Sequence, residues 1–251
     1  MNKFVAAFAC SLLLMSLLSC STAPEPPAYN AVQYVDPQIG SVHGRWFFYT
    51  PGAMPFGMAK PAPHTNAYES IGSWLPGGYD DRHTSIEGFG QFHEFQIGGV
   101  VLMPTTGAIQ TTPGTLENPD AGYRSRFRKE NEQAEPGYYS VLLDDYNIKT
   151  ELTATPRVCY YRFTFPASQQ AHLLFDLGHK QGESSDIKEA FGRLVSPNEV
   201  EGYVETTPEY IKFCDPDNSV KMYFVARLSK PVLPDSKSAR KQPKPKAPAT
   251  D

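Results

Sequence analysis

The residues of this chain best suited to chemistry lie in one stretch, from Gly77 to Gly107. It reads GGYDDRHTSIEGFGQFHEFQIGGVVLMPTTG and places histidines, carboxylates and aromatic rings between glycine-rich turns and one short apolar run. Its titratable side chains include Asp80, Asp81, His83, Glu87, His93 and Glu94. Polar and aromatic groups on a loop held by a scaffold are typical of a ligand site, and of a sugar site in particular.

The two histidines make different cases for ligand contact. His83 follows two aspartates and an arginine, so it is either a hydrogen-bonded loop residue with a carboxylate partner or a ligand contact. His93 and Glu94 stand between two phenylalanines. Aromatic neighbours lower the local polarity, and a titratable group there is costly unless it is bonded or used. We predict substrate contact for all three residues, with a structural role as the alternative.

Aromatic rings are the second ingredient of a sugar site, because the C–H face of a pyranose stacks on a flat ring. Trp74 and Tyr79 flank the sequence Pro76-Gly77-Gly78 and would present such rings. Core packing is the alternative for both. We predict that both residues contact substrate.

Motifs for several other kinds of chemistry are absent from the sequence. It contains no nucleophile elbow, P-loop, dinucleotide-binding fingerprint or HExxH. The segment from Asp215 to Asn218 resembles the start of a calcium loop, but it lacks the glycine of the sharp turn and the closing glutamate. A surface turn is the better interpretation.

The first 20 residues predict export. They carry one lysine and then an apolar run that is too short to span a bilayer. The residues before Cys20 resemble a bacterial lipobox, which predicts lipidation of Cys20 and a periplasmic or outer-membrane lipoprotein held by its lipid. An ordinary cleaved signal peptide with an incidental cysteine is the alternative. Residues 21–31 would then form a tether.

The other end and the overall charge argue against a nucleic-acid partner. Residues 231–251 are rich in lysine, proline and alanine without apolar periodicity, so we predict a disordered tail. The net charge is -4 and the isoelectric point is about 5.9, which give no support to nucleic-acid binding.

Only two cysteines, Cys159 and Cys214, lie outside the export signal. A disulfide is possible in an exported protein. Neither residue belongs to a CxxC pair, and we favour two buried free thiols.

Residues 32–230 predict one all-β domain, an antiparallel β-sandwich. Glycine and proline interrupt the sequence too often for long helices, whereas apolar and polar residues alternate in several short runs. Gly99–Met103 is predicted to be a core strand that leads out of the polar loop. The other predicted strands are Tyr138–Leu143, Tyr146–Thr155, Val158–Phe165, His172–Leu177, Gly202–Val204 and Val220–Leu228.

Four separated motifs together point to a known family. In order, they are YVDPQIG, PGAMPFGM, GYDDRHTSIEGFGQFHEFQIGGVVLMPTTG and PGYYSVLLDDYNIKTELTATPRVCYYRFTFP. The chain from about Tyr34 to about Pro231 resembles the N-terminal domain of glycoside hydrolase family 92, exported α-mannosidases typical of Bacteroidetes. Several motifs in the expected order are far more specific than any one of them.

This resemblance implies a β-sandwich that packs on a larger (α/α)6-barrel domain, with the active site in the cleft between them. It implies calcium-dependent, inverting exo-α-mannosidases, in which an acid and a base stand far enough apart to admit a water. In the family, both carboxylates and the calcium ligands come from the barrel, which this chain lacks. We therefore expect no catalytic residue and no metal ligand here.

Two function classes follow from this resemblance. In the first, the chain is the carbohydrate-contacting domain of a mannosidase for mannose-containing glycans, truncated before the barrel and inactive alone. In the second, it is a stand-alone glycan-binding surface lipoprotein. A structural remnant with an uncovered barrel-facing surface is a third alternative.

Overall fold

The computed structural model describes residues 30–42, 49–66, 78–91, 99–179, 187–207, 215 and 218–233. The chain divides into two units, Met1–Val35 and Asp36–Asp251. In the first unit, the 3-10 helix η1 (Ala31–Tyr34) is capped by Asn30, whose side chain accepts a hydrogen bond from the backbone N–H of Val32. The predicted signal, Cys20 and most of the tether lie outside the described residues, as does most of the predicted tail.

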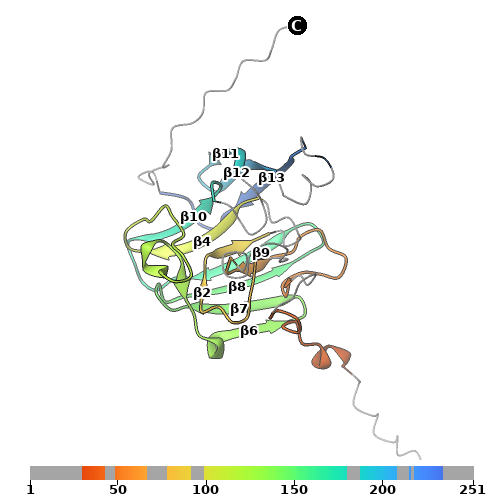
Figure 1. Cartoon of the computed structure of the whole chain (residues 1–251). Coiled ribbons are helices and arrows are strands. Elements are labelled where there is room, and N and C mark those ends of the chain that lie inside the picture. Colours follow the sequence, from red (N-terminus) through yellow and green to blue (C-terminus); the bar gives the residue numbers. More distant parts are fainter. Residues whose placement is uncertain are drawn as a thin grey trace, which may run out of the picture. The chain divides into compact units, whose positions relative to one another are not determined.

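The second unit holds all the described strands, and all their pairings are antiparallel (Figure 1). The central sheet has the order β1 (Ala62–His64), β3 (Gly88–Gly90), β4 (Val101–Thr106) and β10 (Ala171–Asp176). A second sheet contains β6 (Glu132–Glu135), β7 (Tyr138–Leu143), β8 (Ile148–Ala154) and β9 (Cys159–Thr164). A third sheet contains β11 (Ile187–Ser196), β12 (Glu199–Thr206) and β13 (Val220–Arg227).

The remaining elements are short. They are β2 (Ser85–Ile86), which pairs with β5 (Ser125–Arg126), and the 3-10 helices η2 (Pro119–Ala121) and η3 (Lys129–Asn131). None of the described residues forms an α-helix, so the predicted all-β antiparallel class is confirmed. In the part of the chain that the structure describes, no helix is long and apolar enough to cross a membrane.

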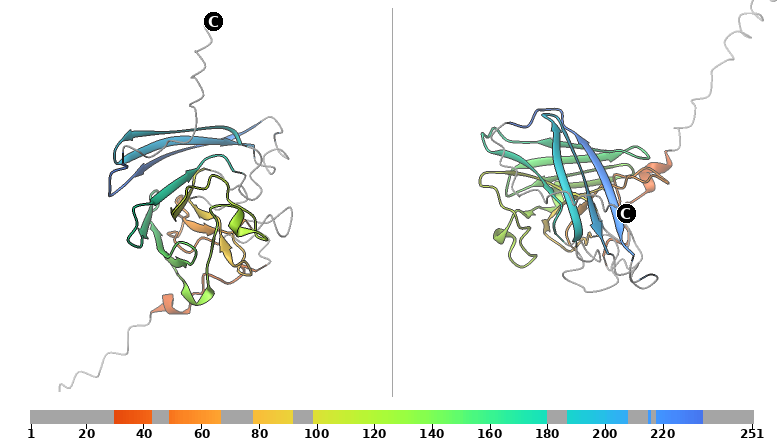
Figure 2. Two further views of the ribbon diagram at one scale, coloured as in Figure 1. Left: turned by 90° about the vertical axis from the view of Figure 1, so that its left-hand side faces the viewer. Right: turned by 90° about the horizontal axis from the view of Figure 1, so that it is seen from above.

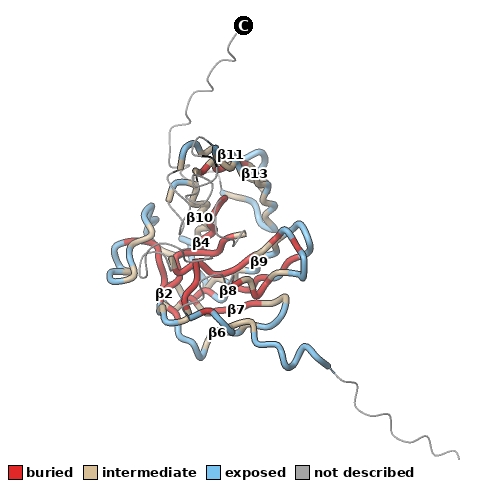
Figure 3. The backbone as a smooth tube through the Cα atoms, turned by 45° about the vertical axis from the view of Figure 1, so that its right-hand side comes forward, coloured by how far each residue is buried: buried red, intermediate tan, exposed pale blue. Residues whose placement is uncertain are grey.

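The central sheet lies between the other two. Met103 of β4 belongs to the main core with residues of β7 and β8, and Leu174 of β10 packs against that core. The next residue of β10, Phe175, faces the opposite way and stacks on Phe224 of β13, with ring centroids 6.2 Å apart. Figure 2 shows the β11–β13 sheet as a separate layer beside β10. Strand β4 is buried at five successive positions because it is covered on both faces (Figure 3).

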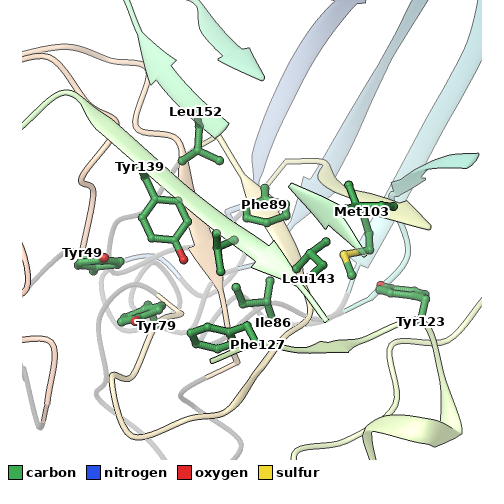
Figure 4. Close-up of a cluster of buried hydrophobic side chains, with 12 residues drawn as sticks. Tyr49, Tyr79, Ile86, Phe89, Met103, Tyr123, Phe127, Tyr139, Leu143 and Leu152 are labelled. Atoms are coloured by element: carbon green, nitrogen blue, oxygen red, sulfur yellow. The ribbon is translucent and has the colours of Figure 1, made fainter. Parts of the chain in front are cut away.

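The main core is unusually rich in tyrosine (Figure 4). The ring of Tyr79 stacks on that of Tyr49 at 4.1 Å, and Tyr139 meets Tyr49 edge to face at 6.2 Å. A buried phenolic hydroxyl usually has a hydrogen-bond partner. Glu132 supplies it for two of these tyrosines, since its carboxylate accepts from Tyr79 and Tyr139, each at 2.7 Å. Tyrosine therefore packs here as a core residue.

Alternation in the sequence located β7, β8 and β9 of the second sheet but not its edge strand β6. Strand β7 has the predicted bounds, and β8 and β9 form the predicted hairpin-like pair around Pro156. One side chain departs from the predicted pattern of a wet face. Glu151 is only 8% exposed because Arg162 and the Tyr138 hydroxyl bind its carboxylate.

Candidate functional site

Thr65, directly after β1, forms hydrogen bonds with Gly78 and Asp80. Its backbone N–H donates to the carbonyl of Gly78 at 2.7 Å, and its hydroxyl donates to the same oxygen at 3.2 Å. The Thr65 hydroxyl in turn accepts from the backbone N–H of Asp80 at 3.0 Å. The segment between these anchor points, residues 67–77, includes Trp74 and lies outside the described residues. Thr65 thus links the residues on either side of the segment that carries Trp74. We call this link the base of the segment.

Of the polar residues predicted to contact substrate, His83 lies among the described residues. Its Nδ1 lies 2.9 Å from the Thr65 hydroxyl oxygen. Because the single hydroxyl proton of Thr65 is directed to Gly78, this oxygen acts as the acceptor for His83. The arrangement assigns the proton to Nδ1 and leaves Nε2 as the acceptor nitrogen. Burial lowers the pKa of His83, and the charge of Asp80 only partly opposes it, so the ring is neutral at neutral pH.

The Asp80 carboxylate is buried beside His83 and held by Arg82. It accepts from Nε of Arg82 at 2.9 Å, from Nη2 at 2.6 Å and from the backbone N–H at 2.9 Å. Burial alone would raise the pKa of Asp80, but the hydrogen bonds from Arg82 outweigh it and hold the pKa below its ordinary value. Asp80 is therefore a fixed negative charge next to a neutral imidazole.

The fully buried side chain of Arg124 stabilises this site through hydrogen bonds and an ion pair. Arg124 donates through Nη1 to the carbonyl of Thr65 at 3.0 Å and to that of Ser85 at 3.4 Å. Through Nη2 it donates to Oε2 of Glu87 at 2.8 Å, and neither side chain of this pair is more than 3% exposed. A buried ion pair is favourable only when further hydrogen bonds satisfy it, as the two carbonyls do here. Arg124 thus joins the base of the Trp74 segment to β2 and Glu87.

A second polar cluster lies at the end of β10. The carboxylate of Asp176 accepts hydrogen bonds from the hydroxyl of Tyr123 and from Nδ1 of His179. It also accepts from the backbone N–H of Gly178 at 2.8 Å. Burial would raise the pKa of Asp176, but the hydrogen bonds from His179 and Tyr123 lower it below its ordinary value. Burial and the charge of Asp176 raise the pKa of Tyr123, which stays protonated.

The structure describes two of the predicted site residues, Tyr79 and His83. Tyr79 is 5% exposed and stacks on Tyr49, so in this structure its ring is part of the core and presents no face to a sugar. His83 is placed beside Asp80, as the sequence indicated, with Thr65 as its hydrogen-bond partner. Trp74, His93 and Glu94 lie outside the described residues, and their contacts with substrate remain predictions.

Sequence reasoning missed Thr65 and Arg124. Arg124 lies beyond the Gly77–Gly107 stretch, and only the pairing of β5 with β2 brings it under the loop. Its neighbours in sequence, tyrosine and serine, give no sign of burial. Glu87, its partner, was within the stretch that the sequence singled out.

The described residues do not fit a calcium site. Nowhere among them do three or more histidine, cysteine, aspartate or glutamate side chains gather as metal ligands. The carboxylates of the two clusters, Asp80, Glu87 and Asp176, are each held by a nearby cation, histidine or hydroxyl. The clusters are suited to holding loops in place.

Comparison with known proteins identifies the family. Residues 34–248 match the family model described as the glycosyl hydrolase family 92 N-terminal domain, so the chain belongs to this family. No curated protein matches the chain.

Two solved structures agree with this assignment. The chain is similar to a family GH92 alpha-mannosidase from Bacteroides thetaiotaomicron, solved alone and in complex with mannoimidazole, with 28% identity and a TM-score of 0.65 in both cases. The match covers 84% of this chain, and 28% and 29% of the mannosidase chain in the complex and alone, respectively. A family GH92 inverting mannosidase from Bacteroides thetaiotaomicron VPI-5482 matches at 18% identity and a TM-score of 0.48, over 83% of this chain and 31% of that one. The chain thus spans less than a third of the length of these relatives.

Proposed function

We propose that this chain is the carbohydrate-contacting N-terminal part of the machinery of an exo-α-mannosidase that degrades mannose-containing glycans. The observation that carries the proposal is the family match over residues 34–248, supported by the 28% identical alpha-mannosidase whose complex contains mannoimidazole. The glycan meets the segment around Trp74 and the GFGQFHEF segment with His93 and Glu94. The Thr65, Arg124 and Glu87 network fixes the base of the first segment.

The chemistry that breaks the glycosidic bond lies outside this chain in the proposal. The catalytic acid and base of an inverting mechanism, and the calcium ligands, belong to the part of the longer relatives that this chain does not match. The chain alone binds the glycan without turnover. Lipidation of Cys20 makes it an outer-membrane or periplasmic lipoprotein.

Binding of mannan and of α-mannobiosides by the full chain tests this proposal. We expect binding that weakens when Trp74 is changed to alanine. The matched control is Tyr160→Ala, which removes a 55% exposed ring from β9. Wild-type chain that binds no mannoside would overturn the proposal.

A second measurement tests whether this chain binds the glycan without cleaving it. The full chain, with and without calcium, should not release mannose from an α-mannobioside. Turnover that disappears in Glu94→Gln would overturn the assignment of catalysis to another domain. Binding retained in Trp74→Ala together with no turnover would overturn the assignment of the loop as the binding site.

A further inference from the structure

The outward face of the β11–β13 sheet carries a row of three aromatic rings. Strand pairing places Phe191 of β11 opposite Tyr203 of β12, and Tyr203 opposite Tyr223 of β13. The ring centroids are 5.8 Å apart in the first pair and 5.6 Å apart in the second. The row runs across the strands, and we call it the aromatic row.

Neighbouring residues show that the aromatic row points away from the central sheet. Phe224, next to Tyr223, stacks on Phe175 of β10. Gly192, next to Phe191, faces the side chain of Leu177. Because successive side chains of a strand alternate between faces, Phe191 and Tyr223 lie on the opposite side. Figure 2 shows the three strands as an outer layer of the second unit. Tyr223 is 75% exposed.

Paired charges border the aromatic row on both sides. On one side, Nζ of Lys221 lies 3.0 Å from carboxylate oxygens of both Glu189 and Glu205. On the other side, Arg193 donates to Glu201 at 2.7 Å. Further along the strands, Lys188 pairs with Glu205 and Arg227 with Glu199. Every charge in this border has an opposite partner, so the surface has no excess charge.

The aromatic row and the balanced charges that border it indicate which class of ligand fits this face. A charged polymer such as nucleic acid needs an excess of one sign, and here the charges cancel. A stable protein interface needs an apolar centre of several hundred square ångströms on each side. Here the apolar part is the aromatic row with Val225 beside it on β13, a strip bordered by charged pairs. A neutral ring with one apolar face and many hydroxyls fits both features. Its face stacks on tyrosine, and its hydroxyls bind the carboxylates and cations of the border.

We propose that the aromatic row is a second glycan-binding site, distinct from the loop site, that takes a neutral polysaccharide chain. The ring of Tyr223 is the main stacking platform because it is the most exposed. Tyr203 is held between its neighbours, with Nζ of Lys221 4.4 Å from its ring centroid and its hydroxyl donating to Glu189 at 2.8 Å. It orients the other two rings. The inference rests on the proposed function only for the class of ligand.

Affinity electrophoresis of the full chain in gels containing neutral mannan tests this inference. Because Tyr223→Ala removes a stacking ring, we expect it to weaken retardation about tenfold, whereas Tyr223→Phe should retain it. Tyr160→Ala is the control for loss of an exposed ring on another sheet. Retardation should persist in high salt because the surface has no excess charge.

Each outcome separates this inference from the proposed function. Weaker retardation in Tyr223→Ala, with further loss when Trp74→Ala is added, supports two sites. Loss in Trp74→Ala alone overturns the second site and leaves the proposed function standing. Loss in Tyr223→Ala alone supports the second site and overturns the loop assignment. A wild-type dimer in size-exclusion chromatography that dissociates in Tyr223→Ala would make the row an interface between copies and overturn the inference.

Discussion

Nη2 of Arg124 lies 2.8 Å from Oε2 of Glu87 in the interior, where neither side chain is more than 3% exposed. The same guanidinium donates to the carbonyls of Thr65 and Ser85. One buried cation therefore holds three separate parts of the chain together. Loss of either member of the pair leaves a buried charge without compensation.

Arg124→Met should lower the free energy of unfolding by about 3–5 kcal/mol, because Glu87 and two carbonyls lose their donor. Urea denaturation followed by circular dichroism measures this change. Arg126→Met is the control, since Arg126 pairs with Asp120 at the surface and should leave stability nearly unchanged. The double variant Arg124→Met with Glu87→Leu should lose less than the sum of the two single variants, and full additivity would contradict the coupling.

Thr65→Val should open the base of the Trp74 segment while it keeps the volume of the side chain. The backbone N–H of Asp80 loses its acceptor, and we expect its hydrogen exchange to become faster than in the wild type. An unsatisfied buried group also costs about 1–3 kcal/mol of unfolding free energy. Thr65→Ser keeps the hydroxyl and should restore protection. Equal exchange rates in both variants would argue against this role of the hydroxyl.

The folded chain should lose stability as acid is added, partly through Asp176. Its pKa is below the ordinary value of 3.8 in the folded state, so its contribution is complete above that value and is lost as the pH falls through the folded pKa. In Asp176→Asn this contribution is absent at every pH. The unfolding free energy of the variant, measured from about pH 6 to pH 2, should therefore fall less steeply than that of the wild type. Parallel curves would contradict the lowered pKa.

Phe56 should be a position where glycine stabilises the protein. Its φ is 61°, in the left-handed region, and its side chain is fully exposed. A residue with a Cβ costs about 1–2 kcal/mol in this conformation. We expect Phe56→Gly to raise the melting temperature, whereas Phe56→Ala keeps the Cβ and should not. Similar melting temperatures for the two variants would show that strain at this turn is unimportant.

Regular alternation made the longer strands predictable. In β9 and β13 every second side chain turns inward, and the sequence places apolar residues at those positions. Strands β1, β2, β3, β5 and β6 were missed because runs of two to four residues carry no clear periodic pattern, and only pairing with other strands defines them. Strand β11 was missed because its sequence, IKEAFGRLVS, mixes charges with both glycine and apolar residues.

The site was less predictable than the fold, for a physical reason. Tyr79 was expected to present its ring to a sugar, but a buried carboxylate on Glu132 satisfies its hydroxyl and allows the ring to enter the core. His83 was predicted to contact substrate, with a loop residue bonded to a carboxylate as the alternative, and in the structure its Nδ1 bonds to the hydroxyl of Thr65, directly after β1. Partners that come from other strands cannot be read from neighbours in sequence.

The burial of β4 on both faces has a consequence for how the chain folds. Its apolar residues need β10 beside them in the sheet, and β10 lies far along the chain. During synthesis β4 leaves the ribosome long before β10, so β3 is available to pair with it but its other edge stays open until β10 is made. We expect slow folding with a high contact order, and a polypeptide that benefits from a chaperone before it is complete.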